Sequence, residues 1–192
     1  MKMPTKTIVF FASGSGSNVE NIVTYFRDKG TDIQFYILCN NPDAKVFARA
    51  ETLHVPIEVF DRKSFKETGE VLAKIKSWKP DLIVLAGFLW LMPEDIVKAY
   101  PNKIINIHPA LLPKFGGKGM YGMKVHSAVV EGKEKETGIT IHYVNEHYDE
   151  GIVILQEFCS IDEFDSPQSV AEKVHQLEYE HFPKVIEKLL FG

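Results

Sequence analysis

The order of apolar runs along the chain constrains the fold more than any other feature of the sequence. Short runs rich in β-branched and aromatic residues alternate with helix-periodic segments, in the order KTIVFFA, NVENIVTYFRDKG, IQFYILCN, AKVFARAETLHV and IEVF. Strands that alternate with helices are typical of a parallel sheet whose two faces are both covered. We therefore predict an α/β fold with a doubly wound, mostly parallel, Rossmann-like sheet and helices on both faces.

The second half of the chain continues this pattern and then departs from it. SFKETGEVLAKIKSW predicts one helix, DLIVLAGF a buried strand, PEDIVKAY a short helix and KIINIH a central strand. TGITIHYVNE and GIVILQEFCSI are separated by only a short polar turn, which permits an antiparallel C-terminal hairpin but no crossover helix. A long helix follows, with Ser166 as its cap and Pro167 at its first position, and Pro183 is expected to kink or break it.

Size and charge limit the classes of partner. The 192 residues, of which 45% are apolar, suffice for one well-filled core, so we expect a single domain over residues 1–192. The net charge of -4 and the scattered Lys and Arg residues argue against a nucleic-acid-binding face. No apolar stretch approaches the ~20 residues of a membrane span, and the N-terminal residues lack a signal-peptide pattern. We expect a soluble cytoplasmic protein with no nucleic-acid or membrane partner.

The turn SGSGSN, residues 13–18, stands between the first expected strand and the first expected helix. Its two glycines let backbone amides approach a ligand, and the N-terminus of the following helix offers free N–H groups to a phosphate. A dinucleotide-binding fingerprint would need a third glycine, but position 19 is Val. A structural alternative is a capping box between Ser17 and Glu20, with the glycines serving only a tight turn. A phosphate site and a cap are compatible interpretations.

Two polar side chains interrupt the apolar strand KIINIH at its end. Asn106 and His108 lie two positions apart and so share a face, and Pro109 ends the strand directly after them. Ligands of open parallel sheets bind beyond the carboxyl ends of the strands, where an amide and an imidazole can address one reacting oxygen. Asp149, in the expected turn between the last two strands, can orient such an imidazole. Alternatively, Asp149 is an ordinary turn residue and His108 a structural polar group.

Five stretches, SGSGSN, KPDLIVLAGFLWLM, NIHPALLPKF, TGITIHYV and DEGIVILQ, carry a family resemblance. The chain resembles the glycinamide ribonucleotide formyltransferases of purine biosynthesis, within the formyltransferase superfamily, over residues 7–190. The resemblance implies the formyltransferase fold, with a phosphate-binding half at about 1–100 and a folate-binding and catalytic half at about 101–192. It implies transfer of the formyl group of 10-formyltetrahydrofolate to the amine of glycinamide ribonucleotide, with small-molecule substrates and no metal.

The resemblance also implies roles for individual residues. The catalytic residues would be Asn106, His108 and Asp149, and the substrate phosphate would be bound by Gly16, Ser17 and Asn18. Glu178 would hold the amine end of the ribonucleotide. The folate would be bound by Arg62, Leu89, Trp90, Leu91, Met92, Asn106 and Val144.

The expected chemistry is direct attack of the amine on the formyl carbon. Asn106 and an imidazolium at His108 would donate to the developing oxyanion, which is a common way of stabilising a tetrahedral intermediate. Asp149 would keep His108 charged and help to move the proton from the attacking to the leaving nitrogen. No covalent intermediate is needed, because the amine is itself a nucleophile.

Two features depart from the family pattern. Trp90 stands where many relatives have Arg, and GGKGMYGMKVH replaces a stretch with closely spaced histidines, of which only His126 is matched. Four glycines within residues 116–122 predict a mobile flap.

Three other functions share part of the pattern. Methionyl-tRNA formyltransferase and formyltetrahydrofolate hydrolase carry an additional domain that we do not expect here. A nucleotide-binding module without turnover is disfavoured by the complete set of Asn106, His108 and Asp149. The sequence is compatible with a monomer or a homodimer.

Overall fold

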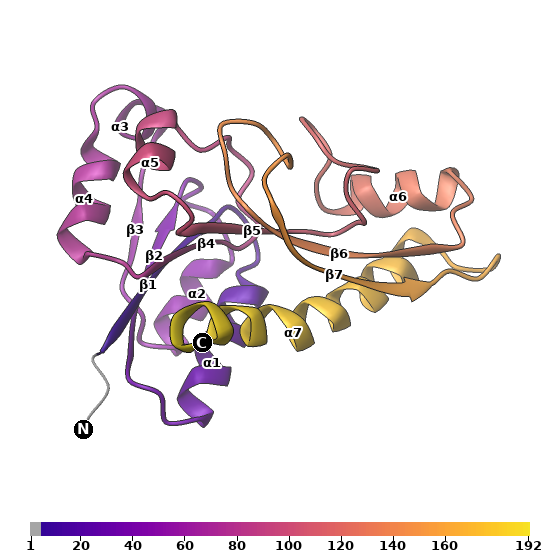
Figure 1. The fold of residues 1–192 in the computed structure, drawn as a ribbon, viewed down its shortest axis with the longest axis horizontal. Coiled ribbons are helices and arrows are strands. Elements are labelled where there is room, and N and C mark those ends of the chain that lie inside the picture. The colour runs from indigo at the N-terminus through magenta and orange to yellow at the C-terminus, as the bar shows by residue number, and fades with distance from the viewer. Residues whose placement is uncertain (1–4) are drawn as a thin grey trace.

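A seven-stranded sheet runs through residues 5–192, the part of the chain that the computed structural model describes (Figure 1). Across the sheet the strands follow the order β3-β2-β1-β4-β5-β6-β7. Their bounds are β1 Lys6–Ala12, β2 Ile33–Cys39, β3 Ile57–Val59, β4 Leu82–Leu85, β5 Ile104–His108, β6 Glu136–Tyr143 and β7 Val153–Ser160. The helices are α1 Ser17–Asp28, α2 Val46–Thr52, α3 Arg62–Lys66, α4 Glu70–Trp78, α5 Glu94–Ala99, α6 Met123–Glu131 and α7 Pro167–Phe191.

The pairing of the strands confirms the predicted topology. The neighbours among β1 to β5 are parallel, whereas β6 is antiparallel to both β5 and β7. The strand order reverses between the neighbouring strands β1 and β4. In open sheets of this kind such a reversal leaves a crevice at the carboxyl ends of the two strands, because their connections run to opposite faces.

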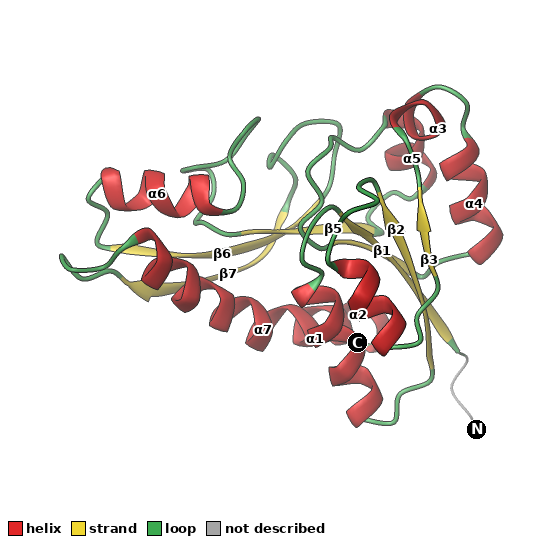
Figure 2. Ribbon diagram, turned by 180° about the vertical axis from the view of Figure 1, so that it is seen from behind, coloured by secondary structure: helices red, strands yellow, loops and turns green. Residues whose placement is uncertain are grey.

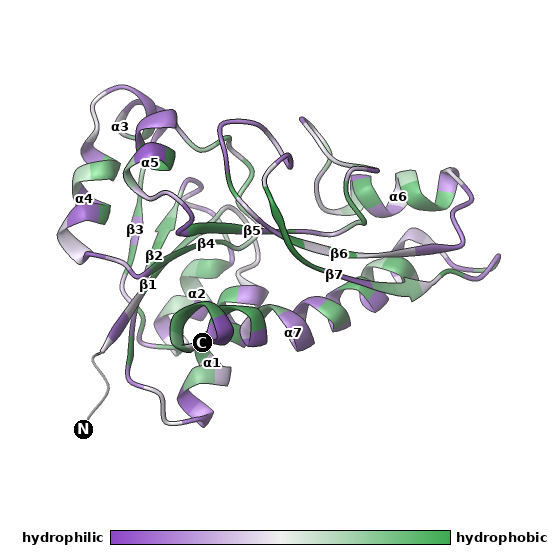
Figure 3. Ribbon diagram, viewed as in Figure 1, coloured by the Kyte–Doolittle hydropathy of each residue, from purple (hydrophilic) through white to green (hydrophobic). Residues whose placement is uncertain are grey.

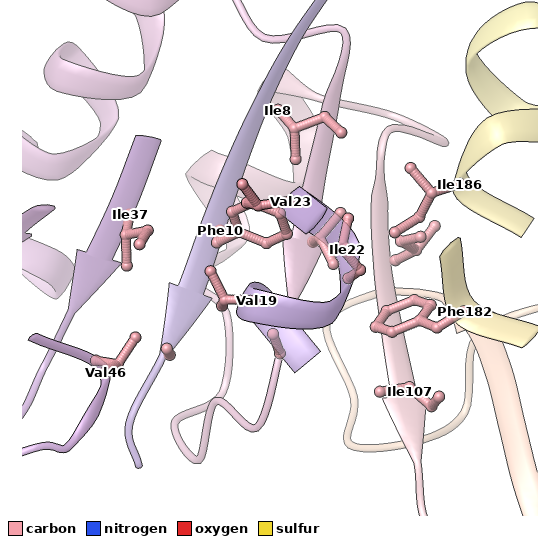
Figure 4. Close-up of a cluster of buried hydrophobic side chains, with 14 of the residues drawn as sticks. Ile8, Phe10, Val19, Ile22, Val23, Ile37, Val46, Ile107, Phe182 and Ile186 are labelled. Atoms are coloured by element: carbon pink, nitrogen blue, oxygen red, sulfur yellow. The ribbon is translucent and has the colours of Figure 1, made fainter. Parts of the chain in front are cut away.

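Helices cover both faces of the sheet, and alternate residues of each strand pack against them. Ile8 and Phe10 of β1 join a core cluster with residues of α1 and with Phe182 of α7 (Figure 4). Val9 and Phe11, which point the other way, join a second cluster with residues of α3, α4 and α5. Hydrophobic residues concentrate on the central strands (Figure 3). A strand that is buried on both faces needs apolar residues along its whole length, as these central strands have.

The structure divides one expected helix into two. SFKETGEVLAKIKSW was predicted as a single helix, but α3 ends at Lys66 and α4 begins at Glu70. Gly69 precedes α4 with a φ of 71°, a left-handed conformation that glycine adopts without a steric penalty and that interrupts a right-handed helix. The structure also contains α6, which the sequence pattern had not predicted.

The last helix runs without a break through Pro183. Ser166 caps α7 and Pro167 occupies its first turn, as predicted, but the expected break is wrong because the helix continues to Phe191. Phe182 and Ile186 are fully buried on either side of Pro183, and this packing offsets the hydrogen bond that proline cannot make. Seen from behind, α7 lies along β6 and β7 (Figure 2). None of the described helices combines the length and the apolar character needed to cross a membrane.

Candidate active site

A cavity of about 610 Å³ opens at the carboxyl ends of β1, β4 and β5, next to the reversal of strand order. Its volume lies within the range of small-molecule sites. The wall contains all the residues for which the sequence predicted a role, namely Gly16, Ser17, Asn18, Arg62, Leu89, Trp90, Leu91, Met92, Asn106, His108, Val144, Asp149 and Glu178. The fold therefore brings the predicted phosphate, folate and catalytic groups to one place, although their roles stay predictions.

Asn106, His108 and Asp149 meet in the wall of this cavity. Asn106 and His108 project from the same face of β5, and Asp149 reaches them from the loop between β6 and β7. The Asn106 Nδ2 atom lies 3.5 Å from Asp149 Oδ1, and the His108 Nδ1 atom lies 3.5 Å from Asp149 Oδ2. Asp149 has a φ of 58°, and the Gly117 N–H donates to its Oδ2 at 2.9 Å. The backbone thus orients the Asp149 carboxylate toward Asn106 and His108.

Asp149 is a carboxylate at neutral pH. Burial by itself would raise the pKa of this side chain, because a low-dielectric site disfavours charge. Favourable interactions with His142, His108 and the Gly117 N–H outweigh that penalty, so the pKa of Asp149 lies below its ordinary value of 3.8. The group is therefore able to accept a proton or to stabilise a neighbouring cation.

Burial disfavours the imidazolium that was expected at His108 and favours the neutral ring. Burial of the ring lowers its pKa below the ordinary 6.5, and the attraction of Asp149 and of the Phe115 carbonyl does not fully offset this. The Nε2 atom lies 2.8 Å from the Phe115 carbonyl oxygen, which can only accept, so Nε2 carries the hydrogen. Nδ1 is then the unprotonated atom, and it faces Asp149. Nε2 donates to the Phe115 carbonyl and Nδ1 carries no hydrogen in this neutral form, so the expected donor role would require a proton on Nδ1, and it stays a prediction.

His142 is a fourth polar residue of this group, and the sequence had not singled it out. It lies directly opposite Asn106 in the antiparallel pairing of β5 with β6, and its side chain is buried. Its Nε2 atom is 3.1 Å from Asn106 Nδ2 and 3.6 Å from Asp149 Oδ1. The sequence signal was the alternation in TGITIHYV, where Thr140 and His142 share a face as Asn106 and His108 do.

The turn before α1 leaves its helix amides without a strong partner, the Ser17 N–H making only a long contact of 3.4 Å to Ser15 Oγ. The predicted capping box between Ser17 and Glu20 is wrong: Gly16 is the N-cap residue, with a φ of 73°, and no side chain caps the helix. Glu20 instead forms an ion pair with Arg49 of α2. Free N–H groups of a first helical turn favour an anion, so the geometry suits the phosphate interpretation.

Helix α2 packs against this turn and forms hydrogen bonds with its backbone. The Val46 N–H donates to the Gly14 carbonyl at 3.1 Å, and Arg49 Nε donates to the Ser15 carbonyl at 2.9 Å. Gly16 packs so closely on Val46 that an added Cβ atom would lie 2.5 Å from its Cγ2 atom. The carbonyls of Gly14 and Ser15 therefore both accept hydrogen bonds from α2.

A buried polar cluster forms the wall between α1, α6 and α7. Asn18 Nδ2 donates one of its two hydrogens to Glu178 Oε2 at 3.0 Å, which ties the side chain to α7 and leaves the backbone N–H for a phosphate. Burial raises the pKa of Glu178, opposed by this hydrogen bond and by His175. Burial, reinforced by His175 and His108, lowers the pKa of His126 to about 4. Asn18 Oδ1 and His126 Nδ1 are buried without a hydrogen-bond partner among the described residues, which marks this wall as a place for polar ligand groups.

The opposite wall is aromatic. Trp90 packs against Phe60, Phe65 and Phe88, and the Arg62 guanidinium lies 5.1 Å from the centre of the Trp90 ring. A cation over an indole face is a favourable contact. Trp90, which stands where many relatives have Arg, therefore adds a flat apolar surface to the expected folate pocket.

The glycine-rich segment 116–122 lies against Asp149, held by the Gly117 contact described above. Its predicted mobility stays a prediction. No group of three or more His, Cys, Asp and Glu residues within residues 5–192 is arranged to hold a metal ion.

Comparisons with known proteins identify the family of the chain. The formyl transferase family model matches residues 6–186. The chain is 38% identical over 190 residues to a phosphoribosylglycinamide formyltransferase of Bacillus subtilis (strain 168), which covers 96% of this chain and 95% of that protein. The fold is similar to the crystal structure of glycinamide ribonucleotide transformylase 1 from Geobacillus kaustophilus, with a TM-score of 0.85, 36% identity, and coverage of 96% and 98%. It is also similar to phosphoribosylglycinamide formyltransferase from Bacillus halodurans, with a TM-score of 0.86, 33% identity, and coverage of 97% and 96%. The chain belongs to the formyl transferase family.

Proposed function

We propose that this protein transfers the formyl group of 10-formyltetrahydrofolate to the amine of glycinamide ribonucleotide, a step of purine biosynthesis. The observation that carries the proposal is the meeting of Asn106, His108 and Asp149 in one cavity with an uncapped helix N-terminus. A carboxamide, an imidazole and a carboxylate suit the transfer of an acyl group to an amine. The chain is a phosphoribosylglycinamide formyltransferase by this proposal, as its relatives are by name.

Asn106 stabilises the tetrahedral intermediate. Attack of the amine on the formyl carbon moves negative charge onto the formyl oxygen, and the Asn106 Nδ2 group can donate a hydrogen bond to it. The loss of one such donor typically costs about 2.7–4 kcal/mol of transition-state stabilisation. Because His108 Nε2 already donates to the Phe115 carbonyl and the unprotonated Nδ1 has no hydrogen to donate, the oxyanion contact falls to Asn106.

His108 carries the proton, and Asp149 stabilises the charge that this creates. The attacking nitrogen must lose a proton and the leaving nitrogen of the folate must gain one, so no net proton is exchanged with solvent. The unprotonated Nδ1 of His108 can accept this proton directly or through a water molecule, and Asp149, 3.5 Å away, stabilises the imidazolium that forms. The proton then passes to the leaving nitrogen, and the ring returns to its neutral state.

Both halves of the domain contribute to the binding of both substrates. In residues 1–100 the first turn of α1, with Gly16, Ser17 and Asn18, receives the phosphate. The folate lies against Arg62, the segment Leu89–Met92 and Val144. Glu178 holds the amine end of the ribonucleotide. Every assigned group comes from one chain, so both a monomer and a homodimer are compatible with this site.

A direct assay tests the function. Purified protein is mixed with 10-formyltetrahydrofolate, with and without glycinamide ribonucleotide, and the release of tetrahydrofolate is followed. We expect release only when the ribonucleotide is present. Release without it would indicate a hydrolase, and no release with saturating amounts of both substrates would refute the proposal.

Substituting Gly16 with Ala is expected to damage the phosphate turn. Alanine is strained at a φ of 73°, at a cost of about 1–3 kcal/mol, and its Cβ atom would press on Val46. We expect a lower melting temperature and a raised KM for the ribonucleotide, both measured on the purified variant. Gly14→Ala is the matched control, since a Cβ atom there meets nothing within 4 Å. Equal melting temperatures for the two variants would refute the steric account.

A further inference from the structure

The contacts of His142 determine the hydrogen that its ring carries. Its Nδ1 atom lies 2.9 Å from the Tyr143 backbone carbonyl oxygen. A carbonyl only accepts hydrogen bonds, so Nδ1 must be the protonated nitrogen. The other nitrogen, Nε2, lies 3.1 Å from Asn106 Nδ2, which only donates. A ring that donates through one nitrogen and accepts through the other is neutral.

The same contacts fix the orientation of the Asn106 carboxamide. Its Nδ2 atom lies between two acceptors, His142 Nε2 at 3.1 Å and Asp149 Oδ1 at 3.5 Å. A reversed carboxamide would place its oxygen against the Asp149 carboxylate oxygen, which only accepts, so that contact would be repulsive. With the orientation set in this way, His142 Nε2 accepts the shorter of the two contacts and holds the carboxamide in place.

We propose that His142 is a positioning residue that holds the Asn106 carboxamide with its NH2 group toward the reacting oxygen. This rests on the proposed function of the site. One of the two Nδ2 hydrogens bonds to His142, and the other, which makes only the long contact to Asp149, is the one that donates to the developing oxyanion. His142 does not touch the substrate in this scheme and acts through Asn106.

A double-mutant cycle tests whether His142 acts through Asn106. His142→Leu removes the acceptor and is expected to lower kcat by about 100-fold, the loss typical of a misplaced catalytic group. His142→Gln retains a side-chain acceptor and should lose less. In the Asn106→Ala background, His142→Leu should change kcat by no more than about threefold, because the group that it positions is already absent. Loss of the same 100-fold in that background would overturn the proposal.

His181→Leu is the matched control for this cycle. His181 lies on α7, where it contacts Glu157 and Glu180 rather than the cavity residues. We expect its substitution to leave kcat near the wild-type value in both backgrounds. Each variant is first compared with the wild type by circular dichroism, so that a folding defect is not read as a loss of catalysis.

Nitrogen NMR of the wild-type protein tests the proposal without any substitution or turnover. With 15N-labelled histidine, His142 is expected to show a neutral ring protonated at Nδ1 at pH 7.5. A cationic ring, or a neutral ring protonated at Nε2, would overturn the proposal. This readout is separate from formyl transfer. An inactive protein with the expected His142 signals would refute the proposed function, whereas an active protein with a cationic His142 would refute only the positioning role.

Discussion

Replacing Asp149 with Asn is expected to lower kcat by about 10²–10⁴-fold, the usual contribution of a group that takes part in proton transfer. The carboxylate faces His108 Nδ1 at 3.5 Å and stabilises the proton that arrives there during the reaction. An uncharged amide cannot do this. The KM values for both substrates should change far less than kcat, because Asp149 acts after the substrates have bound. Steady-state kinetics on the purified variant measures both effects.

The design of this substitution separates charge from shape. Asn adopts the left-handed conformation of residue 149, where φ is 58°, more readily than most residues, and its side-chain oxygen can still accept from the Gly117 N–H. Glu150→Gln is the matched control, because it removes an adjacent, exposed carboxylate. Turnover of Asp149→Asn close to that of this control would remove the role assigned to Asp149.

Replacing His108 with Ala is expected to lower kcat by about 10²-fold or more, since the proton acceptor is lost. The variant also loses the contact that holds the Phe115 carbonyl at 2.8 Å, so its fold must be compared with the wild type by thermal unfolding. Substrate affinity, measured by equilibrium binding, should change less than kcat. A folded His108→Ala variant with near-native turnover would show that the proton moves by another route.

The pH dependence of kcat gives a second test of His108. Burial lowers the pKa of this ring below 6.5, so the ring is neutral at pH 7 and becomes protonated only as the pH falls through that lowered value. A protonated ring cannot accept the proton of the amine. Wild-type kcat should therefore decline on the acid side, and the residual activity of His108→Ala should lack this decline. Asp149, with a pKa below 3.8, stays charged over the same range.

The central part of the site could be predicted from the sequence because its signals are local. Asn106 and His108 are two residues apart on a strand that ends at a proline, and the alternation of strands and helices places that end at the ligand-binding edge. Asp149 was a candidate from its place in the turn between the last two strands, and the resemblance to a known family implied a catalytic role for it. All three lie in the wall of the cavity.

The remaining features depend on contacts between distant segments. His142 becomes part of the group only through its pairing with Asn106, and that register is set by the whole β5–β6 connection. Glu20 fits a capping box by sequence, but Arg49, far along the chain, binds it instead. The lowered pKa of His108 follows from burial, which the spacing of residues in the sequence does not reveal. Local patterns predicted the elements, and tertiary contacts determined how the side chains are used.

The most direct measurement is a crystal structure of the protein with glycinamide ribonucleotide and a folate analogue whose formyl group is replaced by a hydrated, non-transferable carbonyl. The account predicts that an oxygen on the tetrahedral carbon lies about 3 Å from Asn106 Nδ2, within hydrogen-bond range. It also predicts the phosphate at the first turn of α1 and the amine nitrogen on the side of His108 and Asp149. A tetrahedral carbon bound out of reach of all three side chains would contradict it.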